Sequence, residues 1–121
     1  MASKNPKKYY VSAKYNAAVD ATATGAQTLR NTSTIPKGAV ITEVVVDTKT
    51  VVTDAANTMK LTGGGVDITK AMSKAERSKT TPFTTVLNGA VVATADADLG
   101  ITAAGAVSTG YVGTFTVGYF L

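Results

Sequence analysis

The sequence predicts an all-β domain, either a sandwich or a small barrel, from its composition and from the spacing of its turn signals. Among 121 residues there are 21 threonines and 19 alanines, with many valines and few leucines. Threonine and valine pack well on a pleated sheet, whereas residues that favour helix interiors are scarce. Turn signals every 8 to 12 residues or so separate about seven to nine short strands. Helical crossovers are missing between them, which argues against a parallel sheet.

The first predicted strand spans residues 7–16, KKYYVSAKYN. Tyr9, Val11, Ala13 and Tyr15 alternate with polar residues, the period of two expected of a half-buried strand. Residues 17–34 alternate only weakly, so strand and loop both stay open there.

The clearest turn signal is I-P-K-G, which leads into a long strand. Pro36 fixes its own φ and pushes Ile35 toward extended geometry, and Gly38 can adopt a turn conformation at low cost. One face of this strand is predicted to consist of Val40, Thr42, Val44, Val46, Thr48 and Thr50. The opposite face is then Ile41, Glu43, Val45, Asp47, Lys49 and Val51. Because the second face mixes charged and apolar residues, we expect it to be partly buried and to border a neighbour.

A hairpin is predicted over residues 58–69, with the triple glycine 63–65 as its turn. Residues 70–79, KAMSKAERSK, form either one short helix or an irregular crossover loop, with the charged side chains on a solvated surface or against an acidic partner.

The remaining strands follow further turn signals. TTPFTTVL is extended, with Pro82 at a sheet edge or strand start, and Asn88-Gly89 marks a turn before AVVATA. Another turn near Gly100 or Gly105 precedes the last strand, residues 109–121. One face of that strand carries Thr109, Tyr111, Gly113, Phe115, Val117, Tyr119 and Leu121. This face holds most of the C-terminal aromatics, so we place it in the core.

The formal charge of +4 lies in an N-terminal arm. Residues 1–14 carry four lysines and no acid, whereas residues 15–121 carry eight basic and eight acidic residues. We therefore divide the chain into a basic arm, 1–8, and a β domain, 9–121. The arm is either a solvated terminus or a reach toward an acidic surface. No apolar run approaches the ~20 residues of a membrane helix, and the N-terminus lacks a secretory signal, so we expect a soluble protein made in a cytoplasm.

Catalysis, cofactors and metals are not expected. The chain has no His and no Cys, so the usual general bases, triads and zinc ligands are missing. Asp96 and Asp98 supply too few oxygens for a calcium loop, which favours solvated turn residues over a weak cation site. The triple glycine lacks the Gly-Lys-Ser/Thr ending of a phosphate loop. Tyr9 and Tyr15 share an apolar face, which favours core packing over stacking on nucleic acid.

Two segments resemble small virion proteins of tailed bacteriophages. TIPKGAVITEVVVDTKTVV, residues 34–52, is similar to a segment in which an I-P-x-G/N-A-x-I turn leads into a Val-rich strand. GAVSTGYVGTFTVGYFL, residues 105–121, is similar to their closing strand. The group that the chain resembles is the capsid decoration (cement, head-stabilising) proteins of β-sandwich type. The resemblance implies a jelly-roll-like antiparallel β-sandwich on the exterior of the phage head, commonly as a trimer, bridging subunits of the major capsid protein without cofactors or nucleic acid.

The capsid contact is predicted from the residues themselves. We expect either the basic arm or the partly buried face of the long strand to meet the capsid. The candidate contact residues are Lys4, Lys7, Lys8, Lys14, Ile41, Glu43, Val45, Asp47 and Lys49. Two alternatives stay open: a minor virion protein such as the base of a head or tail fibre, and a carbohydrate- or receptor-binding sandwich. A fibre base would carry a further domain, which we do not expect beyond Leu121, and a sugar site would expose aromatics on loops.

Overall fold

The strands of this protein were located in a computed structural model that describes residues 7–20, 22, 25–30, 33–50, 58–73, 77, 82–104 and 111–121. The described residues form β1 (Lys8–Asn16), β2 (Gly25–Thr28), β3 (Thr34–Ile35), β4 (Val40–Thr50), β5 (Thr58–Gly63), β6 (Val66–Asp67), β7 (Phe83–Thr84), β8 (Val91–Val92), β9 (Ala97–Asp98), β10 (Gly100–Ala104) and β11 (Val112–Phe120). The all-β prediction is confirmed. The division of the chain at residue 8 stays a prediction.

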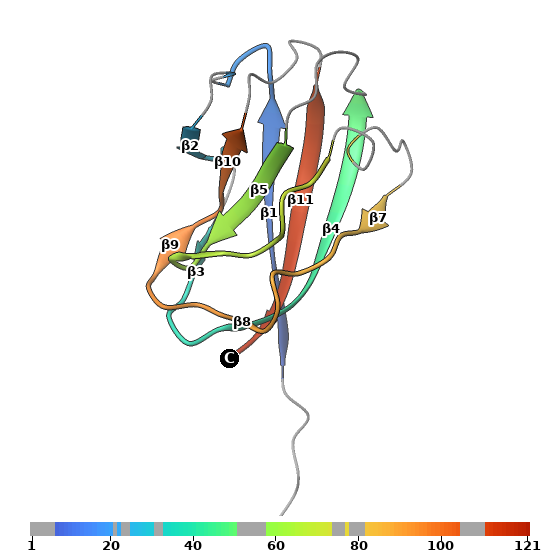
Figure 1. The fold of residues 1–121 in the computed structure, drawn as a ribbon. Helices are drawn as coiled ribbons and strands as arrows, with labels where there is room; N and C mark the ends of the chain where they lie inside the picture. The colour runs from blue at the N-terminus through green and yellow to red at the C-terminus, as the bar shows by residue number, and fades with distance from the viewer. Residues whose placement is uncertain are drawn as a thin grey trace, which may run out of the picture.

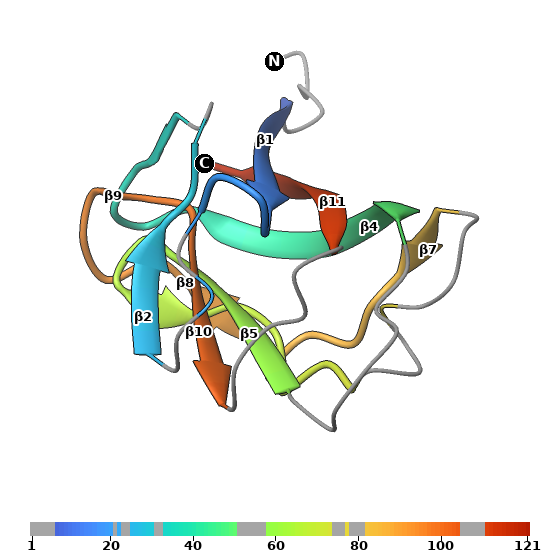
Figure 2. The same cartoon turned by 90° about the horizontal axis from the view of Figure 1, so that it is seen from above.

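Two antiparallel sheets pack face to face. The first has the order β1-β11-β4-β7, and β8 also pairs with β4. The second has the order β2-β10-β5-β6, and β3 and β9 form a separate pair. Figure 1 shows β1, β11 and β4 as long arrows side by side, and Figure 2 shows them as one layer over β2, β10 and β5. The fold is therefore an antiparallel β-sandwich with its core between the two layers.

Strand β11 lies at the centre of the first sheet and fills much of the core. Its inward residues Phe115, Val117 and Tyr119 are buried, as is Tyr111 just before it, as the sequence predicts. Leu121 is exposed, so its predicted burial is wrong, because it lies beyond the last paired residue of the strand. Thr109 lies outside the described residues. The second sheet and the residues next to its strands meet this surface with Met59, Leu61, Ile68, Met72, Leu99 and Ile101.

Strand β1 confirms its predicted alternation. Val11, Ala13 and Tyr15 are buried, and Tyr9 stacks on Tyr119 with a ring-centroid distance of 5.5 Å. Tyr9 and Tyr15 both turn toward the sandwich interior. These tyrosines therefore pack in the core, which favours the core interpretation over a surface for stacking on nucleic acid.

Strand β4 departs from regular alternation at two bulges. Its register against β11 shifts between Gly118 and Tyr119, where Thr42 has no partner, and again between Val112 and Gly113. A bulge puts two successive residues on the same face. The predicted faces are therefore correct from Val44 to Thr48 and wrong before the first bulge: Ile41 is buried in the core, and Val40 is exposed.

The predicted turns are present where glycine can supply a positive φ. Gly38 has a φ of 89° before β4, Gly64 and Gly65 have φ values of 58° and 79° between β5 and β6, and Gly89 has a φ of 70° before β8. Gly100 is wrong as a turn, because it begins β10 and pairs with β2 and β5. The alternative turn at Gly105 lies outside the described residues.

The segment 70–79 forms no helix over its first four residues, and Met72 pairs instead with Met59. Residues 74–76 and 78–80 lie outside the described part of the chain. Arg77 is helical and fully buried, so the expectation of a solvated surface is wrong at this position.

The Arg77 guanidinium lies over the Tyr111 ring, 5.3 Å from its centroid, and Tyr111 is tilted against Tyr15 with a centroid distance of 5.9 Å. The aromatic face stabilises the cation at the edge of the core. Burial raises the pKa of Tyr15 to about 12 and also raises the pKa of Tyr111, so both phenols are neutral at physiological pH.

The β5–β6 turn offers a test of how tightly the sandwich is closed. A Cβ on Gly64 would lie 2.5 Å from the Cβ of Ala93, whereas a Cβ on Gly89 would meet nothing within 4 Å. Both glycines have positive φ, so Gly89→Ala should lower the free energy of unfolding by about 1–2 kcal/mol. Gly64→Ala should lower it by about 2–4 kcal/mol, because overpacking adds to the strain. Urea denaturation measures both values, and equal losses would contradict the close packing described here.

Candidate docking interface

The outer face of the first sheet, which points away from the second sheet, carries an apolar strip at one end. In the strand register, Phe120 lies opposite Val40, and Val40 lies opposite Val92. The exposed fractions are 61% for Tyr10, 45% for Val40 and 49% for Val92. We define the apolar strip as Tyr10, Val40, Val92 and Phe120. It contains three of the six exposed large apolar side chains in the described residues.

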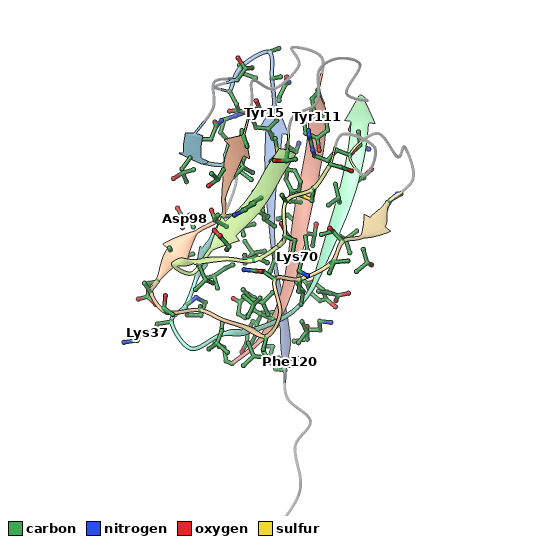
Figure 3. All side chains as sticks on the ribbon, viewed as in Figure 1. Tyr15, Lys37, Lys70, Asp98, Tyr111 and Phe120 are labelled. Carbon is green, nitrogen blue, oxygen red and sulfur yellow. The ribbon has the colours of Figure 1, made fainter. Side chains whose placement is uncertain are left out.

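The strip runs across four strands and not along one. Tyr10 comes from β1, Phe120 from β11, Val40 from β4 and Val92 from β8. Figure 1 shows the start of β1, the C-terminus and β8 at the same end of the sandwich, and Figure 3 places Phe120 there, far from Tyr15. A contiguous exposed apolar area of this kind is typical of an interaction surface.

An ion pair between Lys8 and Glu43 crosses β11 beside the strip. The two residues come from β1 and β4, and they pass over Gly118 of the strand between them. A Cβ on Gly118 would lie 2.8 Å from Lys8 Cε and 2.9 Å from Glu43 Oε1, so only glycine leaves room for this pair. The Lys8 ammonium also lies 5.5 Å from the Tyr10 ring centroid and 5.7 Å from that of Phe120. The pair therefore holds two rings of the apolar strip in place.

The charges of this pair depend on one another. The hydrogen bond to Glu43 raises the pKa of Lys8, and the hydrogen bond from Lys8 lowers the pKa of Glu43. The stabilisation from Glu43 is therefore present above the ordinary Glu pKa and is lost as pH falls through the lowered value. The stabilisation from Lys8 is present below the ordinary Lys pKa and is lost as pH rises through the raised value. The ion pair is intact at neutral pH.

The predicted contact residues fall into four groups. Lys4 lies outside the described residues. Lys8 and Glu43 lie together beside the apolar strip, and Lys7 is exposed nearby with its ammonium 5.3 Å from the Tyr9 ring centroid. Lys14, Val45, Asp47 and Lys49 lie further along the outer face, where Lys49 approaches Asp47 at 3.8 Å. Ile41 is in the core, so its predicted place on the outer face is wrong. That any of these residues meets a capsid stays a prediction.

Most of the apolar strip was missed from sequence. Val40 was assigned to the core face because the pattern alone gives no sign of the bulge at Thr42. Tyr10 and Phe120 do carry a signal, since each alternates with buried residues of its own strand. Their position opposite the core face predicts two aromatic side chains on the outer face of one sheet.

The carboxylates singled out from sequence make hydrogen bonds within the protein. Asp96 accepts one from the Lys37 backbone N–H at 2.7 Å, and Asp98 accepts one from the Thr34 hydroxyl at 2.8 Å. Within the described ranges, no group of three or more His, Cys, Asp or Glu side chains is placed to hold a metal ion. The same residues contain no helix long and apolar enough to cross a membrane.

The fold is shared with chains of two bacteriophage capsid structures. One belongs to the acid-stable capsid of Helicobacter pylori bacteriophage KHP30, with a TM-score of 0.62 and 15% identity, and the match covers 94% of this chain and 87% of that chain. The other belongs to the capsid asymmetric unit of cyanophage Pam1, with a TM-score of 0.68 and 16% identity over 100% of this chain and 92% of that chain. No protein-family model and no curated protein sequence matches. At these identities the likeness establishes a common fold.

Replacing Gly118 tests the ion pair. Since the added Cβ would collide with both side chains, Gly118→Ala should separate Lys8 from Glu43 and return the Glu43 pKa toward its ordinary value. Carbonyl-detected NMR titration follows that pKa, and Lys8→Gln should raise it in the same way. Lys60→Gln is the matched control, because it breaks the Lys60–Asp67 pair on the second sheet. A Glu43 pKa that stays low in Gly118→Ala would contradict the geometry described here.

Proposed function

We propose that this protein is a structural component of a bacteriophage virion: a decoration protein that binds the exterior of the assembled head and stabilises it by bridging major capsid subunits. The observation that carries the proposal is the match to chains of two phage capsid structures over nearly the whole of both partners. The match covers 87% and 92% of the two capsid chains, so the likeness extends over nearly the whole of each matched fold. The sequence resemblance of residues 34–52 and 105–121 points to the same class independently.

The topology supports a jelly roll. Apart from the short β3–β9 pair, the strand orders are β1-β11-β4-β7 with β8, and β2-β10-β5-β6. The chain-terminal strands β1 and β11 lie next to each other, and the chain crosses repeatedly between the two sheets, while β5–β6 and β7–β8 each stay within one sheet, an arrangement compatible with two Greek keys. Jelly rolls occur in viral capsid domains and also in lectins. The exposed aromatic residue of the described part, Tyr10, lies on a strand and not in a loop, which favours docking over sugar binding.

The outer face of the first sheet is the proposed capsid-binding surface. It offers an apolar strip for burial, and the Lys8–Glu43 ion pair orders the rings of that strip before binding. Less conformational entropy is then lost when a partner covers them. The surface needs only to bind, so the proposal assigns no reaction and no cofactor to this protein.

The proposal includes a homotrimer, which follows from the resemblance. Sedimentation equilibrium should then give a mass three times the 12.3 kDa of one chain. A mass equal to one chain at micromolar concentration would contradict a trimer in solution.

Capsid binding is tested with undecorated heads made from the major capsid protein of the same genome. Val40→Ser/Val92→Ser removes two apolar side chains from the apolar strip. If each loses about 1 kcal/mol of burial, binding should weaken roughly tenfold or more. Val19→Ser/Val86→Ser is the matched control, because those valines are 69% and 66% exposed and lie outside the strip.

Co-sedimentation of labelled protein with the heads gives the dissociation constants. Equal binding by the two double variants would show that the strip is not the contact. A wild-type protein that leaves the heads undecorated at all concentrations would refute the decoration role itself.

A further inference from the structure

A basic pocket opens at the other end of the same outer face, beyond the polar pair of Ser12 and Thr116, whose hydroxyls are 2.9 Å apart. Its volume is about 300 Å³, and the charged side chains that line it are Lys14, Arg30 and Lys49. The polar residues Asn16 and Thr114 line it as well, and none of its lining residues is acidic. Figure 3 shows this end of the sheet around Tyr15, far from Phe120.

The three cations reach the pocket from three separate parts of the fold. Lys14 lies on β1, and its backbone N–H donates to the Arg30 carbonyl at 3.1 Å, which brings the chain after β2 alongside the edge of β1. Lys49 comes from β4, where it is the extra residue of the second bulge and has no partner on β11. The three cations are therefore brought together by strand pairing and by the bulge, and not by a local run of charge in the sequence.

Arg30 is held in a fixed position. Its Nε donates to Asp20 Oδ1 at 2.7 Å and its Nη2 to Asp20 Oδ2 at 3.2 Å, while Asp20 also accepts from the Asn16 backbone N–H at 2.7 Å. Burial alone would raise the pKa of Asp20, but these hydrogen bonds outweigh burial and keep that pKa low. A guanidinium has five N–H donors, so the fork with Asp20 leaves three for another acceptor.

Lys14 and Lys49 have weaker ion pairing within the described residues than Arg30. Lys49 approaches Asp47 at 3.8 Å, the longest ion pair among the described residues. Lys14 makes no ion pair with any acidic residue in the part of the chain that the structure describes. An ammonium without a partner beside an anchored guanidinium attracts an anion, and planar carboxylates match the guanidinium fork best.

We propose that this pocket binds a carboxylate side chain of the protein on which the outer face docks. The inference rests on the proposed function, because a partner that covers the apolar strip and continues along the same sheet reaches the pocket. Tyr15, Val112 and Gly113 line the pocket as well, but every charged side chain in its lining is a cation, which favours an anionic group over an uncharged apolar ligand. The apolar strip then supplies burial, and the pocket fixes the orientation of the partner through charge.

The anion site is tested first without a capsid, by ¹H–¹⁵N NMR titration with acetyl-hexaglutamate amide. The backbone amides of Lys14, Asn16 and Thr114 should shift and saturate. Lys14→Gln/Lys49→Gln should weaken this binding about tenfold, because both ammonium groups of the pocket are removed. The matched control is Lys37→Gln/Lys70→Gln, which lowers the net charge equally at exposed positions away from the pocket and should bind within twofold of wild type.

Two results would overturn the proposal in this titration. Shifts that do not saturate, or that weaken equally in both double variants, would mean attraction to overall charge only. Saturation with inorganic phosphate but not with hexaglutamate would mean a site for a free anion and not for a protein carboxylate.

Binding to undecorated heads separates this inference from the proposed function. We expect Lys14→Gln/Lys49→Gln to bind heads more weakly than Lys37→Gln/Lys70→Gln, with the difference shrinking as salt increases. Equal binding by both variants would overturn the role of the pocket while the decoration role stands. If the wild-type protein binds hexaglutamate to saturation but does not bind heads, the decoration role and the partner named here would be refuted. The carboxylate-binding site itself would still be supported.

Discussion

The structure depends on the pairing of β11 with β1 on one side and with β4 on the other. Because side chains alternate along a strand, a slip of one residue would turn Phe115, Val117 and Tyr119 out of the core together. The same strand carries two glycines, Gly113 and Gly118, against which other side chains pack so closely that a Cβ would collide with them. Gly113 leaves space for the Tyr111 hydroxyl, 2.7 Å from where a Cβ would lie, and Gly118 leaves space for the Lys8–Glu43 ion pair. One strand thus fixes the core on one face and the shape of the outer surface on the other.

The outer face that results has different chemistry at its two ends. At the end near the C-terminus, apolar side chains from four strands form the apolar strip, ordered by an ion pair. At the opposite end, cations from three segments surround a pocket. Residues on paired strands hold their spacing better than residues on loops, which suits the proposed role of holding neighbouring capsid subunits in position. Burial and charge are separated along the sheet, so affinity and orientation can be altered independently.

The sequence predicts the strands well and the surface poorly, for one physical reason. Alternation reports which residues of a strand share a face. Once Tyr15 and Phe115 are placed in the core, the other core positions of β1 and β11 follow at every second residue. A bulge changes the face without changing the composition, and the one at Thr42 reversed the places of Val40 and Ile41. The pocket brings together Lys14, Arg30 and Lys49 through pairing between distant strands, which no local pattern encodes. Arg77 was also unpredictable, since its burial depends on the ring of Tyr111.

The central claim is that the outer face of the β1–β11–β4 sheet is the docking surface of a capsid decoration protein. A cryo-electron microscopy reconstruction of heads saturated with this protein tests it most directly, at a resolution that separates the two sheets. The account predicts that β1, β11 and β4 face the shell, with Val40 and Val92 against a capsid subunit and an acidic residue of that subunit at Lys14. A reconstruction in which the β2–β10–β5–β6 sheet faces the shell and the first sheet faces solvent would contradict the account.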